Sequence, residues 1–196
     1  MALGFNTSSA PVGDILPTIR FDAKAGDLLR VDRTQDAMGD WQTNIQDMLL
    51  PQEIVFDFEN MEVGYMHFEK GQAPSFAMVK VGGKMPERPS ENHNQGFRIR
   101  VANSDLGLRE FCGNSKTLLG AMDKLHDEYV AESRNNPGKM ALVSVDGTNT
   151  VEVNTPKGTL RFKAPEWRIA GWVDAPSEFN GGSAEAPAQS EEEPLF

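Results

Sequence analysis

The chain has 196 residues, 39% of them hydrophobic, with 18 glycines, 12 prolines and one cysteine. This length suits one globular domain, and the glycine and proline content favours a loop-rich β or α+β domain over a helical bundle. A single cysteine excludes an intramolecular disulfide, which fits a reducing cytoplasm. The first residues contain no basic region and no long apolar run, so we expect a cytoplasmic protein without a membrane segment.

The formal net charge is −10, but the charges are segregated along the chain. Residues 1–83 carry 12 acids and 6 bases, residues 84–172 carry 11 acids and 13 bases, and residues 173–196 carry 6 acids and no base. A relatively basic section therefore lies between an acidic front and an acidic end. The net charge alone does not exclude binding to nucleic acid.

The first half of the chain is predicted to be mostly strands. Residues 18–21 and 28–31 are short candidates, and 41–50 is a candidate short helix. Apolar and polar residues alternate over 53–58, and a turn at Glu59 leads into a second run over 61–69, a pattern typical of a hairpin. A third strand is predicted over 75–81, followed by a long exposed loop over 82–96.

One helix is predicted in the second half, between strands. After a strand over 97–101, Ser115 is a good N-cap, and Leu118, Met122, Leu125 and Tyr129 recur at helical spacing, which predicts a helix over about 115–134. Four strands are predicted to follow, over residues 140–145, 150–153, 159–163 and 167–173. Turns are predicted after the first and the third of these strands. This order fits a mainly β, OB-like, partly open barrel with one helix and long loop insertions, although other β-rich folds share it. We expect a domain over 1–176 and a flexible acidic tail over 177–196.

Two predicted strands place cations on one face. Alternation puts Arg98 and Arg100 opposite the apolar residues of 97–101, and Arg161 and Lys163 opposite those of 159–163. A solvated sheet face explains this equally simply, but two such ladders without an acid on the same face favour a track for phosphates. Further cations that could extend the track are Lys80, Lys84, Arg88, Lys157 and Arg168.

Single-strand binding also needs aromatic rings on which bases stack, each worth about 1–3 kcal/mol per base. Tyr65, Phe76 and Trp167 are the candidates, and Trp41 and Trp172 are further ones. For each ring alone, packing in the core is the more common role. An enzyme is not expected, because the chain has no zinc-type Cys/His spacing, no glycine-rich phosphate loop and no nucleophile elbow. No cofactor or metal is expected.

The chain ends in a segment with four carboxylates, no cation and a single apolar tip, SAEAPAQSEEEPLF. Such a segment cannot bury enough apolar surface to offset the entropy of ordering it. Its last residues resemble the C-terminal tip of bacteriophage-type single-stranded DNA-binding proteins, in which acids and a proline precede a final phenylalanine. The matching residues are Glu191, Glu192, Glu193, Pro194, Leu195 and Phe196, with Glu in place of Asp and with Leu195 inserted.

The resemblance implies a protein that coats exposed DNA without sequence preference during replication, recombination or repair. It also implies that the tail recruits replication or recombination proteins. The long linker of the cellular members is missing, so we expect a monomer or homodimer. Two alternatives remain open: a β-rich virion or assembly protein, and an acidic DNA mimic that inhibits a DNA-handling enzyme.

Overall fold

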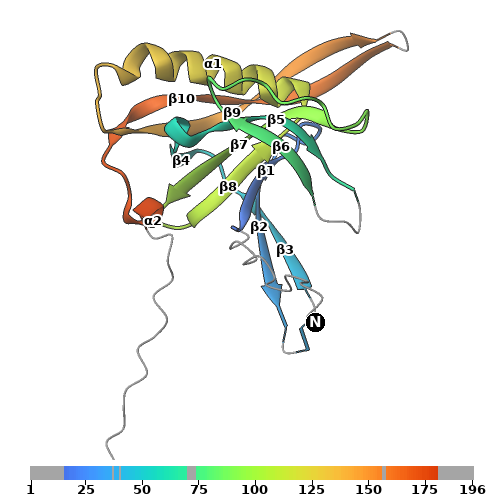
Figure 1. Ribbon diagram of the computed structural model, residues 1–196, viewed down its shortest axis with the longest axis horizontal. Helices are drawn as coiled ribbons and strands as arrows, with labels where there is room; N and C mark the ends of the chain where they lie inside the picture. Colours follow the sequence, from blue (N-terminus) through green and yellow to red (C-terminus); the bar gives the residue numbers. More distant parts are fainter. Residues whose placement is uncertain (1–15, 37, 40, 70–73, 156–157, 181–196) are drawn as a thin grey trace, which may run out of the picture.

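The computed structural model describes residues 16–36, 38–39, 41–69, 74–155 and 158–180 (Figure 1). Over this range the protein is mainly β, with one long helix, as predicted. The elements in chain order are β1 (Thr18–Phe21), β2 (Leu28–Gln35), β3 (Trp41–Met48), β4 (Gln52–Phe56), the 3-10 helix η1 (Phe58–Asn60), β5 (Glu62–His67), β6 (Ser75–Lys80), β7 (Asn94–Asn103), β8 (Gly107–Gly113), α1 (Lys116–Ser133), β9 (Met140–Thr155), β10 (Gly158–Val173) and α2 (Ser177–Asn180).

The strands form one sheet in the order β10-β9-β4-β7-β8-β1-β2-β3, and β5 joins it beside β7 and carries β6. All pairs are antiparallel except β1 with β8. In the described part of the chain, β10 and β3 do not pair with each other, so the sheet is open. Two long hairpins, β2–β3 and β9–β10, extend away from the body in different directions (Figure 1).

The core lies between α1 and one face of the sheet. Leu118, Met122 and Leu125 of the helix are buried, as their spacing predicts, and they pack with sheet residues such as Phe97 and Phe111. The predicted cap is confirmed, since the Ser115 hydroxyl accepts a hydrogen bond from the Leu118 N–H. This apolar face anchors the sheet and leaves the opposite face of β7 and β8 free for polar side chains.

The predicted hairpin between 53–58 and 61–69 is wrong. β4 ends at Phe56 and pairs with β7 and β9, whereas β5 pairs with β6 and β7. Between them the chain turns through η1, where the buried Asp57 carboxylate accepts hydrogen bonds from Asn60 and from Arg100 of β7. These side-chain bonds stabilise a tight turn that sends β5 away from β4.

Three other predictions differ from the structure. Residues 41–48 form β3 rather than a helix, because they pair with β2 along its whole length. The turns predicted at 146–149 and 164–166 do not interrupt β9 and β10, which pair as continuous 16-residue strands. The two predicted breaks face each other in this pairing, and a register shift between Glu166 and Trp167 absorbs the irregularity as a bulge.

Candidate nucleic-acid interface

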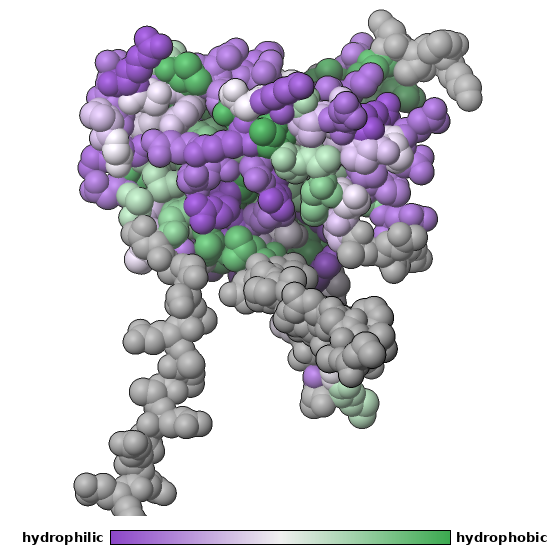
Figure 2. All heavy atoms as spheres, in the orientation of Figure 1, coloured by the Kyte–Doolittle hydropathy of each residue, from purple (hydrophilic) through white to green (hydrophobic). Residues whose placement is uncertain are grey.

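Several of the predicted site residues share the sheet face that points away from α1. In register, Lys80 of β6 and Arg98 of β7 both lie opposite Glu62 of β5, and Arg98 also lies opposite Cys112 of β8. Directly paired residues project to the same side of a sheet. Because side chains alternate along a strand, Phe76 projects to the same side as Lys80 on β6, and Arg100 to the same side as Arg98 on β7. We call the surface formed by Arg20, Arg33, Phe76, Arg98 and Arg100 the outer sheet face. Hydrophilic side chains gather over β7 and β8 in Figure 2.

Arg98 and Arg100 are not isolated cations. The Arg98 guanidinium lies 2.6 Å from the Glu62 carboxylate and 3.7 Å from that of Glu110. Arg100 lies 2.6 Å from Asp57. The acids come from neighbouring elements rather than from β7 itself, which is why the strand sequence alone does not reveal them. Both arginines remain about one-third or more exposed, so an anion in solvent can still reach them.

Burial raises the pKa of two β8 side chains near Arg20 and Arg98, the Glu110 carboxyl and the Cys112 thiol. Desolvation raises the pKa of the Glu110 carboxyl, an effect that Arg98 opposes and Glu62 reinforces. Burial, with help from Glu110, also raises the pKa of the Cys112 thiol to about 11, although Arg20 and Arg98 both oppose it. The thiol is therefore neutral at pH 7 and is not an activated nucleophile. The strand register places both arginines near Cys112, because Arg98 is its partner on β7 and Arg20 directly follows Ile19, the β1 partner of Phe111.

An exposed pair of aromatic rings stands beside these arginines. Phe68 and Phe76 are 43% and 36% exposed, and their rings meet edge to face at 5.9 Å. The Arg98 guanidinium lies over the Phe76 ring, 5.4 Å from its centroid. Exposed phenylalanines in contact with an arginine are the combination on which unpaired bases stack. The structure therefore brings together Phe76 and Arg98, two predicted residues, and adds Phe68.

A groove of about 520 Å³ lies next to the ring pair. Its lining includes Arg20 of β1, Arg33 of β2, Phe68, Glu69, Cys112 and Leu118. Among the described residues, neither Arg20 nor Arg33 has a carboxylate within ion-pair distance. Sequence reasoning missed both, because each is the only cation on its face of its own strand. Only the pairing of β1 with β8 and β2 aligns them with Arg98.

The second predicted ladder lies elsewhere, on the β9–β10 hairpin. Arg161 pairs with Glu152 at 3.0 Å, and the Lys163 ammonium donates a hydrogen bond to the Thr150 hydroxyl. Arg168, beyond the bulge, pairs with Asp146. These partners belong to β9, whereas those of Arg98 and Arg100 belong to β5, β8 and the turn after β4. The structure does not join the two ladders into one track.

The remaining predicted residues are spread more widely. Lys80 donates to the Asn60 side chain, Lys84 is exposed in the loop after β6, and Arg88 closes that loop by donating to the backbone carbonyls of Glu91 and His93. Tyr65 is half-buried on β5. Lys157, the side chain of Trp41 and the tail residues 191–196 lie outside the described residues.

Trp167 and Trp172 pack against α1. The Trp167 ring contacts Phe56 and Phe111 edge to face, and its indole N–H donates to the Ala121 carbonyl. Trp172 stacks on Tyr129 and donates to Glu132. These contacts are those of residues in the core and at its edge. The rings beside the arginines are Phe68 and Phe76, next to Arg98, and Phe179, whose ring centroid lies 5.8 Å from the Arg100 guanidinium.

Within the described residues, no group of three or more His, Cys, Asp or Glu side chains is arranged to hold a metal ion. In the same residues, no helix has the length and apolar character needed to cross a bilayer. Comparison with known proteins finds no matching family model, no similar curated protein and no similar solved structure.

Proposed function

We propose that the protein binds single-stranded DNA without sequence preference through the outer sheet face, as a cytoplasmic accessory in replication, recombination or repair. The observation that carries the proposal is the exposed Phe68–Phe76 pair, with Arg98 over one ring and the groove of Arg20 and Arg33 beside it. The rings offer stacking faces for bases, and the arginines offer charge for phosphates. Neither feature distinguishes one base from another, so binding tolerates any sequence.

The open sheet serves in this proposal as the binding face of an OB-like barrel does. Glu62, Glu110 and Asp57 keep Arg98 and Arg100 positioned in the free protein, and bound phosphates share these cations rather than replace the carboxylates. Arg20 and Arg33 have no such partner among the described residues, so they supply most of the counterion release when DNA binds.

The first test removes these two cations. R20Q/R33Q is expected to weaken binding of fluorescein-labelled oligo-dT and to reduce the dependence of log affinity on log salt by about 1.4, since each phosphate contact to a single strand contributes about 0.7. Fluorescence anisotropy over a salt series measures both quantities. The matched control is R134Q, which removes an exposed arginine at the end of α1. An unchanged salt slope in R20Q/R33Q would contradict the proposed interface.

We further propose that residues 191–196 recruit partner proteins, because three glutamates close to Leu195 and Phe196 suit a basic-rimmed apolar pocket on another protein. Deleting these residues is expected to leave oligo-dT affinity unchanged or higher, since the deletion removes anionic charge. It is also expected to abolish co-purification of replication proteins, and F196A is expected to reproduce that loss with the charges kept. Weaker DNA binding by the truncated protein would show that the segment belongs to the DNA site instead.

A further inference from the structure

The groove on the outer sheet face continues into a second groove around the start of α1. This second groove, of about 700 Å³, is lined by Lys24 and Lys116 and by the apolar side chains of Leu29 and Phe162. It shares Arg20, Phe21 and Ser115 with the first groove. Arg20 is therefore a wall residue of both grooves.

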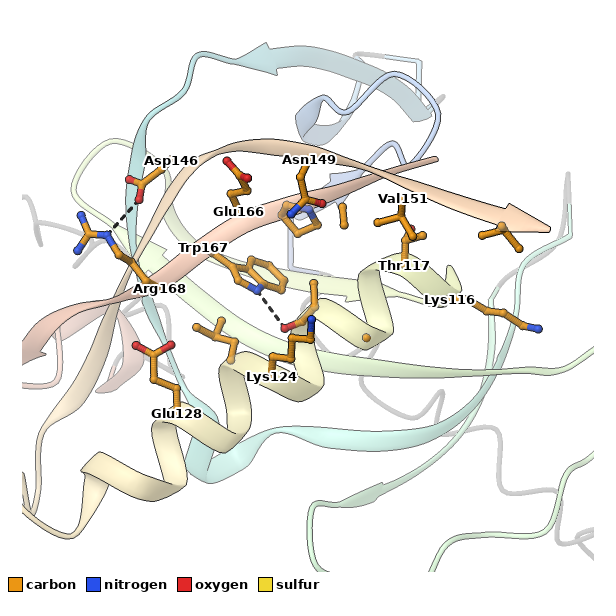
Figure 3. A pocket seen from close by; sticks show the side chains of 16 residues that line it. Lys116, Thr117, Lys124, Glu128, Asp146, Asn149, Val151, Glu166, Trp167 and Arg168 are labelled. Carbon is orange, nitrogen blue, oxygen red and sulfur yellow. Dashed lines mark hydrogen bonds and ion pairs between the residues drawn. The ribbon is translucent and has the colours of Figure 1, made fainter. Parts of the chain in front are cut away.

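A third groove, of about 610 Å³, follows between α1 and the β9–β10 hairpin (Figure 3). It shares Lys116, Thr117 and Val153 with the second, so the three grooves follow one another as a path in which each groove shares wall residues with the next. Lys124, which follows Lys116 further along α1, lines the same groove.

The far end of this path has an apolar wall and a basic wall. Val151 pairs in register with Phe162, and Val153 pairs with Leu160, so these side chains share one face of the hairpin. Leu160 at the outer end is 50% exposed. Lys116 and Lys124 of α1 line the same groove as Val151 and Val153. Both are exposed and have no carboxylate within ion-pair distance among the described residues.

The carboxylates that line the third groove have partners of their own, with one exception. Asp146 pairs with Arg168 and accepts a hydrogen bond from the Ser144 hydroxyl, which is the main reason that its pKa is lowered. Glu128 accepts a hydrogen bond from the Ile169 N–H. Glu166 is exposed and remains the one acid of the groove with no partner among the described residues. Lys116 and Lys124 therefore remain available to an anion.

We propose that a single DNA strand bound on the outer sheet face continues past Arg20, around the start of α1, and into the groove under the hairpin. Lys116 and Lys124 contact its phosphates along this stretch. Its bases contact Phe162, which lines the second groove, and Val151 and Val153, which line the third. We call this segment, defined by these five residues, the hairpin channel. The proposal rests on the proposed function and adds a second segment to the binding site, which only longer strands reach.

The test compares two lengths of oligo-dT on wild-type protein and on K116Q/K124Q. Lengths of about 5 and about 16 nucleotides bracket the usual range of single-strand site sizes. The double variant is expected to bind the short oligonucleotide as wild type does, and to bind the long one at least fivefold more weakly, with a salt slope smaller by about 1.4. R134Q again serves as the control for loss of a solvated charge on α1.

The outcomes separate the two proposals. If wild-type protein binds neither oligonucleotide, the proposed function fails. If it binds both and K116Q/K124Q binds the long one as tightly as wild type does, the hairpin channel is wrong and the outer sheet face stands. If the variant loses affinity for both lengths equally, the lysines belong to the first segment and the two-segment path is wrong.

Lysine acetylation on the wild-type protein provides a readout that does not depend on a variant. The long oligonucleotide is expected to protect Lys116 and Lys124 from acetic anhydride, and the short one is expected to leave both reactive, as measured by peptide mass spectrometry. Lys139, an exposed lysine beyond the end of α1, is the internal control. Equal reactivity of Lys116 and Lys124 with and without the long strand would overturn the proposal.

Discussion

Arg98 shows how one side chain of this sheet serves both the fold and the proposed site. Its guanidinium pairs with Glu62 and Glu110 on the neighbouring strands and also covers the Phe76 ring. The carboxylates hold the planar guanidinium in place, which lowers the entropy lost when a phosphate or base contacts it. Ion pairs at this degree of exposure contribute at most about 1 kcal/mol to stability. Their larger consequence is the orientation of the arginine.

Glu110 gives a residue-scale prediction on pH. Its pKa is raised, chiefly by burial, so the folded protein holds this proton at pH values where the unfolded chain has released it. Stability from this group is therefore present at low pH and is lost as pH rises from 4.5 through the folded pKa. E110Q is expected to match wild type at pH 4 and to be the more stable protein at pH 7, by up to about 1 kcal/mol.

Urea unfolding of both proteins across this pH range measures the difference. E87Q, which changes an exposed glutamate in the loop after β6, is the control and is expected to follow wild type at every pH. If E110Q is instead less stable than wild type at pH 7, the ion pair with Arg98 outweighs the cost of burying the carboxylate.

At the scale of elements, the sequence predicts those helices and strands whose conformation depends on residues close together in the chain. The cap and apolar spacing of α1, the alternation of β1 and the apolar run of β6 are each visible within a few residues of sequence. The strand β3 and the unbroken course of β9 and β10 cannot be predicted from neighbouring residues, because their conformation follows from pairing with a partner strand. β8, with Arg109 and Glu110 in its middle, lacks an apolar run and was not predicted.

The residues of the candidate site also fall into two groups, those that the sequence of one strand predicts and those that only the strand pairing brings together. Arg98, Arg100 and Phe76 could be predicted, because alternation within one strand defines the face on which each residue lies. Arg20, Arg33 and Phe68 could not, since they come from three separate segments that meet through the parallel pairing of β1 with β8 and through the β5–β6 hairpin. For the same reason the sequence suggested one track through Arg98 and Arg161, whereas the structure places these residues on elements with different neighbours.

At the scale of the whole molecule, a net charge of −10 coexists with a local path of cations. Arg33, Arg20, Lys24, Lys116 and Lys124 line three grooves that share wall residues, and the same grooves also contain the acids Glu69, Asp22, Glu128, Asp146 and Glu166. The two phenylalanines mark one end of this path, and the apolar face of the β9–β10 hairpin marks the other. In the proposed function, binding through such a path depends on local charge and stacking, and we expect the acidic remainder of the surface to limit non-specific attraction to duplex DNA.

The most direct measurement of the central claim is a titration of oligo-dT, and of a duplex of equal length, with wild-type protein and with F68A/F76A. Wild type is expected to prefer the single strand, and the variant is expected to lose tenfold or more of that affinity, since each stacked base contributes about 1–3 kcal/mol. V130A, which truncates an exposed apolar residue of α1, is the control. Binding of the single strand by F68A/F76A as tightly as by wild type, or a wild-type preference for the duplex, would contradict the account.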